Sequence, residues 1–182
     1  MIITISGLPG SGKSTIGKML ADHFGYKRYS IGDLRGKMAM DRGMTIEELN
    51  ELGEKEAWTD KEADEYQIEL AKKEDNFVID GRVSYYFIPQ SFKIFLDVNL
   101  DEAARRVFSN PRPDEKPVDT IEELKRAMAA RLESDARRYK QYYGITYPDK
   151  RAFDIVIDTS NLSPEQILDR IINAMVVWKP KS

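Results

Sequence analysis

Short apolar runs alternate with longer amphipathic stretches along the whole chain. The apolar runs predict five strands, at residues 2–6, 28–30, 77–80, 93–97 and 154–158. Three of these runs end in Asp, and continuous apolar runs are typical of strands buried on both faces of a parallel sheet. The amphipathic stretches predict helices at residues 13–24, 33–42, 45–73, 100–108, 120–142 and 163–177. Strands separated by helices predict an α/β fold with right-handed crossovers.

The helix boundaries carry their own sequence features. Thr45 and Thr120 each stand three residues before a Glu, as in a capping box, and Ser163 is followed by Pro at the first helical position. Residues 109–119 hold three prolines and several charges between two predicted helices. This composition predicts a mobile loop.

Composition restricts the class of protein. A length of 182 residues predicts a single domain spanning residues 1–182. The net charge of −3 gives no overall attraction to nucleic acid or to an anionic membrane, and no apolar run approaches the length of a membrane span. The chain has no cysteine and one histidine, His23, so disulfides and multi-histidine metal sites are excluded. We therefore expect a cytoplasmic protein.

Glycines crowd the turn after the first predicted strand. Residues 7–14, GLPGSGKS, match the pattern G-x-x-x-x-G-K-[ST]. Small residues let successive backbone N–H groups surround an anion, and the following helix adds the positive end of its dipole. Lys13 is expected to reach the outer phosphates of a nucleotide and Ser14 to ligate Mg²⁺. An incidental glycine turn is the alternative, and the strand before it and helix after it favour phosphate binding. The predicted phosphate-binding residues are Gly7, Pro9, Gly10, Ser11, Gly12, Lys13, Ser14 and Thr15.

A second charged group follows the strand at residues 77–80. Asp80 ends this strand and Arg82 stands two residues later. A carboxylate at the carboxyl end of a strand can hold Mg²⁺ through water. Arg82 can then bind the phosphate of an acceptor by a bidentate contact. The alternative is an ordinary strand-ending turn with a surface arginine.

A third charged group lies on the predicted helix at residues 120–142. Arg131, Asp135 and Arg138 are spaced i, i+4, i+7, so they share one helical face. Two arginines held by an acid are suited to clamping a phosphoryl group in transfer. A solvated charged face is the alternative. The helix follows the loop at 109–119, which is where a closing lid would be attached.

Together these segments resemble the nucleoside-monophosphate kinases, and most closely the archaeal-type cytidylate kinases. The resemblance extends from GLPGSGKST through FVIDGRV and KIFLDV to the R-x-x-x-D-x-x-R face and FDIVIDTSNLSPEQI. It implies a P-loop NTPase fold of three layers, with a five-stranded parallel sheet in the order 2-3-1-4-5. It also implies an acceptor-binding helical insertion at about 31–73 and a short lid at about 109–119.

The resemblance also implies roles for single residues. Residues 10–15 would cradle the donor ATP, Asp80 would assist Mg²⁺, and Arg82 would bind the acceptor phosphate. Arg131 and Arg138 would surround the transferred group, with Asp135 holding them or touching the base. Three further residues fall in the segment that resembles the acceptor wall, although a polar helix surface is the alternative for them: Asp60, Asp64 and Gln67.

Two positions depart from the family pattern. An arginine is common four residues after Gly32, where this chain has Gly36; Arg35 precedes it and Lys37 follows it. Either Arg35 reaches the acceptor phosphate from a different direction, or Lys37 substitutes, or the acceptor is not CMP. The lid arginine expected after the Arg105–Arg106 pair is replaced by Asn110, with Arg112 displaced into the loop.

The predicted function is transfer of the γ-phosphoryl group of ATP to CMP or dCMP, with Mg²⁺, by a monomeric enzyme. One alternative is a kinase for another monophosphate, AMP or UMP, or for a small metabolite. Shikimate-type kinases carry D-x-D after the second strand, which residues 29–33 (YSIGD) do not match. A non-catalytic nucleotide-binding module is the other alternative, although such a module needs no second phosphate grip. The tyrosines at 139, 142, 143 and 147 are expected to pack inside the domain, and a contact between subunits is the alternative.

Overall fold

Five parallel strands form the centre of the protein. The computed structural model describes residues 1–111, 113 and 115–179. Its sheet has the order β2-β3-β1-β4-β5, which confirms the predicted order and fold class. The strands are β1 (Ile2–Gly7), β2 (Lys27–Ser30), β3 (Phe77–Asp80), β4 (Phe92–Asp97) and β5 (Ile155–Asp158).

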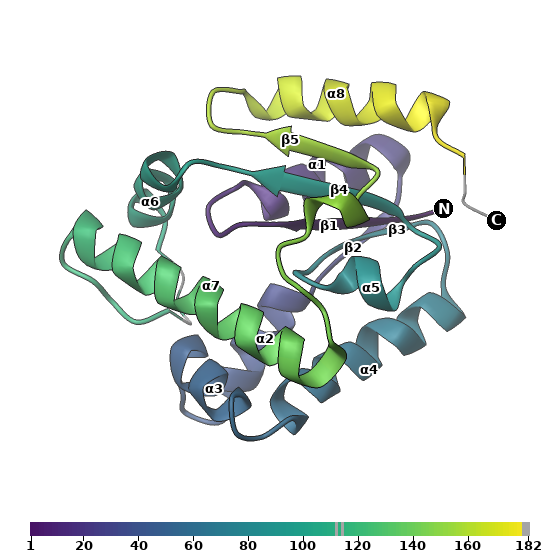
Figure 1. The fold of residues 1–182 in the computed structure, drawn as a ribbon. Helices are drawn as coiled ribbons and strands as arrows, with labels where there is room; N and C mark the ends of the chain where they lie inside the picture. Colours follow the sequence, from purple (N-terminus) through teal and green to yellow (C-terminus); the bar gives the residue numbers. More distant parts are fainter. Residues whose placement is uncertain (112, 114, 180–182) are drawn as a thin grey trace.

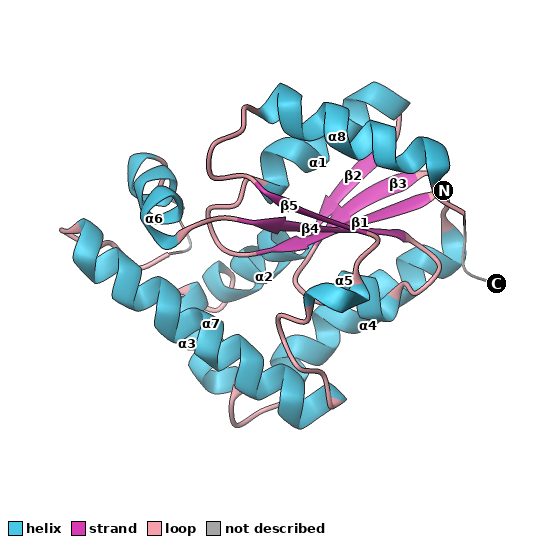
Figure 2. Ribbon diagram, turned by 45° about the horizontal axis from the view of Figure 1, so that its top comes forward, coloured by secondary structure: helices cyan, strands magenta, loops and turns pink. Residues whose placement is uncertain are grey.

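Helices cover both faces of the sheet, which gives three layers (Figure 1). Figure 2 shows α1 (Lys13–Phe24) and α8 (Pro164–Val177) on one face. The opposite face carries α2 (Ile31–Met40), α3 (Ile46–Gly53), α4 (Trp58–Lys73), α5 (Ser84–Phe87) and α7 (Ile121–Tyr143). Helix α6 (Leu100–Ser109) lies beyond the carboxyl end of β4, and a short 3₁₀ helix (Lys150–Ala152) precedes β5. None of the helices in the described part of the chain is long and apolar enough to cross a bilayer.

The alternating faces of β1 explain why both sides of the sheet are covered. Ile3 and Ile5 pack against α1 and α8, whereas Ile2 packs on the other side with Ile79 and α4 residues such as Ala63. All four apolar side chains of β1 and β3 named here are at most 6% exposed. The runs of β1 and β3 are therefore buried on both faces, as expected for central parallel strands, whereas the edge strands β2 and β5 are partly exposed.

One predicted helix is wrong as a single element. The stretch 45–73 forms two helices, α3 and α4, with a break at residues 54–57. A tertiary contact accompanies the break: Tyr142 Oη donates to the Gly53 carbonyl at 2.6 Å. A side chain at Gly53 would meet Thr59 Oγ1 at 2.6 Å, so glycine lets the start of α4 approach this closely. The prediction also missed α5, and it began α2 two residues late, because Ile31 already follows the cap Ser30.

The parallel strands bring their carboxyl ends to one edge of the sheet. Asp80 pairs in register with Ile5 of β1 and Ser30 of β2, and Gly7 pairs with Leu96 of β4. The glycine-rich turn and the Asp80–Arg82 turn therefore start side by side.

The division into an acceptor insertion and a lid stays a prediction. Part of the predicted lid, including Arg112, lies outside the described residues.

Candidate active site

A cleft of about 660 Å³ opens at the carboxyl edge of the sheet. The glycine-rich turn and the first residues of α1 form one end of it. The turn after β3, one face each of α2, α3, α4 and α7, and residues 110–118 in part form the remainder. Such an edge is where open α/β sheets bind their ligands.

The glycine-rich turn is built to hold an anion with its backbone. Gly10 and Gly12 have positive φ values of 73° and 88°. Helix α1 starts at Lys13 after Gly12, and no side chain caps its first N–H groups. Ser14 and Thr15 line the cleft, while Ser11 Oγ is buried with no hydrogen-bond partner among the described residues. Uncapped amides at the positive end of a helix dipole form a phosphate site.

Lys13 is held ready beside this loop. Its Nζ donates to the Gly7 carbonyl at 3.0 Å and to the Leu8 carbonyl at 2.7 Å, and the residue lines the cleft. These bonds hold the ammonium group at the entrance of the loop, where the outer phosphates of a nucleotide would lie. The residues present thus fit a nucleoside triphosphate.

The same edge offers two oxygen ligands of the kind that Mg²⁺ prefers. Ser14 Oγ is exposed at the cleft, and Asp80 is buried in its wall. Asp80 already accepts bonds from Arg28 Nη2 at 2.6 Å and Ser30 Oγ at 2.9 Å, one on each oxygen. These bonds fix the carboxylate, whose remaining lone pairs suit water ligands of a metal ion.

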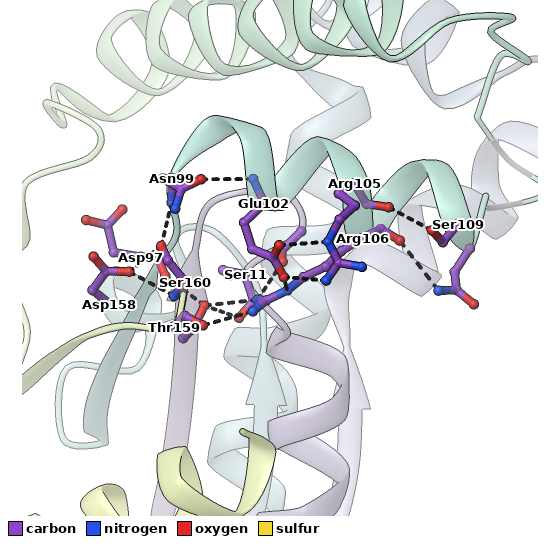
Figure 3. Close-up of polar contacts among 12 residues, drawn as sticks. Ser11, Asp97, Asn99, Glu102, Arg105, Arg106, Ser109, Asp158, Thr159 and Ser160 are labelled. Atoms are coloured by element: carbon purple, nitrogen blue, oxygen red, sulfur yellow. Dashed lines mark hydrogen bonds and ion pairs between the residues drawn. The ribbon is translucent and has the colours of Figure 1, made fainter. Parts of the chain in front are cut away.

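Helix α6 supports the loop from behind (Figure 3). Arg106 donates to the Gly10 carbonyl at 3.3 Å and to the Thr159 carbonyl at 2.8 Å, and Thr159 Oγ1 bonds to the Ser11 carbonyl at 3.2 Å. A side chain at Gly10 would meet the Ala103 carbonyl of α6 at 2.6 Å. Arg106 also pairs with Glu102, where it and Arg105 lower the pKa of the carboxyl to about 2. The loop is therefore fixed from two elements outside its own sequence.

A continuous row of alternating charges crosses the other end of the cleft. Arg82 pairs with Asp135 at 2.5 Å, and Arg138 bonds to Asp135 and to both oxygens of Asp60 at 2.5 and 2.6 Å. Arg35 completes the row with a 2.7 Å bond to Asp60. The row joins the turn after β3 to α7, α4 and α2. Each carboxylate has two arginine partners, and the three arginines exceed the two carboxylates, so the row keeps one excess positive charge.

The pKa values follow from this pairing. Burial works against the charged form of Asp135, but Arg82, then Arg138 and Arg131, hold its pKa below the usual range. Burial also opposes the charge on Arg138, and Asp135 outweighs it, so the pKa of Arg138 is raised. Asp135 and Arg138 therefore stay ionised near neutral pH.

The structure revises two roles within the predicted R-x-x-x-D-x-x-R face. Arg138 is 1% exposed, lies outside the cleft lining and is enclosed by Asp60 and Asp135, which is the geometry of a positioning residue. Asp135 holds Arg138 and Arg82, not Arg131. Arg131 lines the cleft and pairs instead with Glu115 at 2.8 Å. Arg131 is therefore the arginine of α7 that a phosphoryl group can reach.

The first departure from the family pattern has a structural answer. Arg35 lines the cleft, and its guanidinium also donates to Asn50 Oδ1 at 2.9 Å. Lys37 is exposed and does not line the cleft, and Gly36 is buried in α2. Of the two candidate groups, the structure brings Arg35 to the site. Asn110, at the second departure, lies at the cleft and bonds to the Arg106 carbonyl at 3.5 Å.

Several functional neighbours were missed from the sequence. The partners Arg28, Asn50, Glu115 and Thr159 come from different elements, and no local spacing connects them to the residues that they hold. Glu115 alone had a usable sequence feature, because it lies in the predicted lid next to the arginine-bearing helix. Of the four tyrosines predicted to pack inside the domain, Tyr139 and Tyr147 are buried there, whereas Tyr142 and Tyr143 are half-buried.

Asp64 is a buried carboxyl in the cleft wall. It accepts bonds from Tyr143 Oη and from Gln67 Nε2, the latter at 3.1 Å. Burial raises its pKa from 3.8 to about 6, against the effect of the Tyr143 bond. The folded protein therefore binds this proton more tightly than the unfolded chain does.

We expect Asp64→Asn to stabilise the protein at pH 8 by up to about 3 kcal/mol, from a pKa difference of roughly two units. The wild type loses this stability as pH rises from about 4 through 6, because Asp64 then ionises while buried, and the variant does not. Urea unfolding of both proteins at pH 4, 6 and 8 measures the difference. Asp22→Asn, on the exposed face of α1, is the matched control. A difference that does not change with pH would contradict the prediction.

The parallel sheet, the glycine-rich turn with Lys13 and the arginines across the cleft together define a P-loop kinase. The chain belongs to the cytidylate kinase-like family, whose model matches residues 2–161. It is 36% identical over 181 residues to the cytidylate kinase of Halobacterium salinarum, covering 98% of this chain and 91% of the relative. The cytidylate kinase of Pyrococcus furiosus is 38% identical over 168 residues, covering 92% of this chain and 84% of the relative.

Solved structures support the fold. A shikimate kinase from Bacteroides thetaiotaomicron superposes with a TM-score of 0.67 at 18% identity, covering 97% of this chain and 99% of that one. An uncharacterized protein from Eubacterium ventriosum gives a TM-score of 0.71 at 21% identity, covering 98% and 99% of the two chains. At these identities the likeness concerns the fold alone.

Proposed function

We propose that the protein transfers the γ-phosphoryl group of ATP to CMP or dCMP. One observation supports this most directly: a loop of backbone amides around Lys13 and the guanidinium groups of Arg35, Arg82 and Arg131 line the same cleft. A nucleotide-binding module needs only the first of these grips. The relatives named cytidylate kinase match nearly the whole chain, which favours CMP as the acceptor over AMP or UMP.

Phosphoryl transfer requires the protein mainly to position the two substrates and to neutralise negative charge on the phosphates. An oxygen of the acceptor phosphate forms a bond to the γ-phosphorus, and the bond from that phosphorus to the β,γ-bridging oxygen breaks in line with it. The acceptor oxygen is ionised near neutral pH, since the second pKa of a phosphate monoester is about 6, so no general base is required. Ser14 and Asp80 would hold Mg²⁺, which would supply charge neutralisation when bound.

The chain's own residues provide the rest. Lys13 and the loop amides hold the donor phosphates, and Arg131 stabilises the negative charge on the transferred group. Arg35 and Arg82 hold the acceptor phosphate in the attacking orientation. Asp135 fixes Arg82, and Arg138 fixes Asp60, so Asp135 and Arg138 act as positioning residues. A monomeric state and a cytoplasmic location stay predictions from the sequence.

A coupled assay of ADP release with a panel of acceptors tests the proposal. We expect the highest kcat/KM with CMP or dCMP, a lower value with UMP and AMP, and little release without an acceptor. Preference for AMP or UMP would correct the acceptor and leave the reaction class standing. Release of ADP that does not depend on any acceptor, or no release at all, would contradict phosphotransfer to a monophosphate.

A further inference from the structure

One face of α4 forms a wall of the cleft. Asp60, Ala63, Asp64 and Gln67 are spaced i, i+3, i+4, i+7, all are buried, and all line the cleft. Their polar groups differ in how many hydrogen bonds and ion pairs they already make. Asp60 is paired with Arg35 and Arg138, so it belongs to the charged row. The remaining part of the wall contains no arginine and offers hydrogen bonds instead.

Gln67 carries the unused hydrogen-bonding capacity of this wall. Its side chain is 0% exposed, and its Nε2 donates to Asp64 Oδ1. Its Oε1 is buried with no partner among the described residues. Asp64 fixes this orientation, because turning the amide over would set two acceptor oxygens against each other. Leaving a buried acceptor unpaired costs about 1–3 kcal/mol, so a ligand donor at this position is favoured.

The position of Gln67 suits the base of an acceptor nucleotide. Arg35, which is held at Asp60, marks the phosphate end of the acceptor region. Gln67 lies seven residues further along α4, about 10 Å away by helical rise. A monophosphate with its phosphate at the arginines would extend its base along this wall toward Gln67.

We infer that Gln67 Oε1 accepts a hydrogen bond from the exocyclic amino group of the acceptor base, and that Gln67 thereby selects an amino pyrimidine over a keto pyrimidine. The inference rests on the proposed function. Cytosine presents an N4 amino donor where a keto pyrimidine presents the O4 acceptor. A keto oxygen at this place would face Oε1, and both acceptors would be left buried and unpaired. The carboxylate of Asp64 next to the amide adds further repulsion against O4.

Gln67→Met tests the inference, because Met fills a similar volume without a strong acceptor. We expect kcat/KM for CMP to fall about 10- to 100-fold and that for UMP to change less than about 3-fold, so the CMP-to-UMP ratio collapses. KM for ATP should stay unchanged. Gln141→Met is the matched control, because Gln141 is an exposed glutamine on α7. If Gln67→Met keeps the CMP-to-UMP ratio of kcat/KM within about 2-fold of the wild type, the inference is overturned.

A second variant covers the case in which Gln67→Met does not fold. Asp64→Asn combined with Gln67→Glu exchanges the amide and the carboxylate, so the wall keeps its charge and still has an acceptor at position 67. This variant is expected to keep the preference for CMP, and loss of that preference overturns the inference. The wild type is assayed first. If it phosphorylates no monophosphate, the proposed function fails. If the wild type prefers CMP and Gln67→Met keeps that preference, only the inference about Gln67 fails.

Discussion

Lys13→Ala is expected to lower kcat at least about 10³-fold, the largest effect on activity of any single change in this chain. The ammonium group sits between the Gly7 and Leu8 carbonyls at the entrance of the phosphate loop. In the reaction it faces the phosphates whose charge is spread out in the transition state. Removal of one such preorganised donor costs about 10²–10³ in rate, and cationic groups on a phosphoryl group contribute up to about 10⁵. The measurement is kcat from the coupled assay at saturating ATP and CMP.

Lys18→Ala is the control for this variant, because Lys18 is exposed on the same helix. It should leave kcat within about 2-fold of the wild type. Lys13→Ala should still unfold cooperatively, because Lys13 is half-buried at the cleft and lies outside the apolar core. Near-normal turnover in Lys13→Ala would show that the glycine-rich turn does not bind the donor phosphates.

Arg138→Met is expected to destabilise the fold by about 3–5 kcal/mol, the largest effect on stability that we predict. Arg138 is buried and bonds to both oxygens of Asp60 and to Asp135. Its removal leaves two carboxylates in the interior with one arginine partner each, and breaking a buried ion pair from one side carries a penalty of this size. Urea unfolding monitored by circular dichroism measures the loss.

Arg131→Met provides the contrast on the same helix. Arg131 lies at the cleft and pairs with Glu115, so its removal should cost less stability than removal of Arg138, which leaves two buried carboxylates each short of a partner. Its kcat should fall severely, because the transferred group loses a cation. If Arg131→Met unfolded more easily than Arg138→Met, the assignment of the two arginines to binding and to positioning would be reversed.

The fold was predictable because its strands are continuous apolar runs. β1, β3 and β4 are buried on both faces, so their own residues identify them as strands without knowledge of the neighbouring strands. The turns at their carboxyl ends come directly after them in the sequence. The break between α3 and α4 was missed because Gly53 is the only helix-ending residue near it, and its close approach to Thr59 and Tyr142 depends on tertiary structure.

The site was predictable where one segment builds it. The glycine-rich turn carries its glycines, its backbone amides and Lys13 within eight residues, so its pattern was enough to locate the site, although Arg106 and Thr159 hold it from outside. The arginines differ, because their roles depend on which carboxylate reaches them. Helical spacing placed Arg131 and Arg138 on one face, but it could not show that Asp60 encloses one of them and Glu115 meets the other. Pairing across elements depends on tertiary structure, which a single helix pattern does not contain.

The row of alternating charges also restricts how the cleft can change shape. Arg138 joins α7 to α4, and Asp135 joins α7 to the turn after β3. Separating these elements would leave the buried carboxylates of Asp60 and Asp135 without arginine partners, so we expect the elements to move together. Opening and closing of the cleft is then expected in other segments, with the cleft face of α4 and the arginines staying in place.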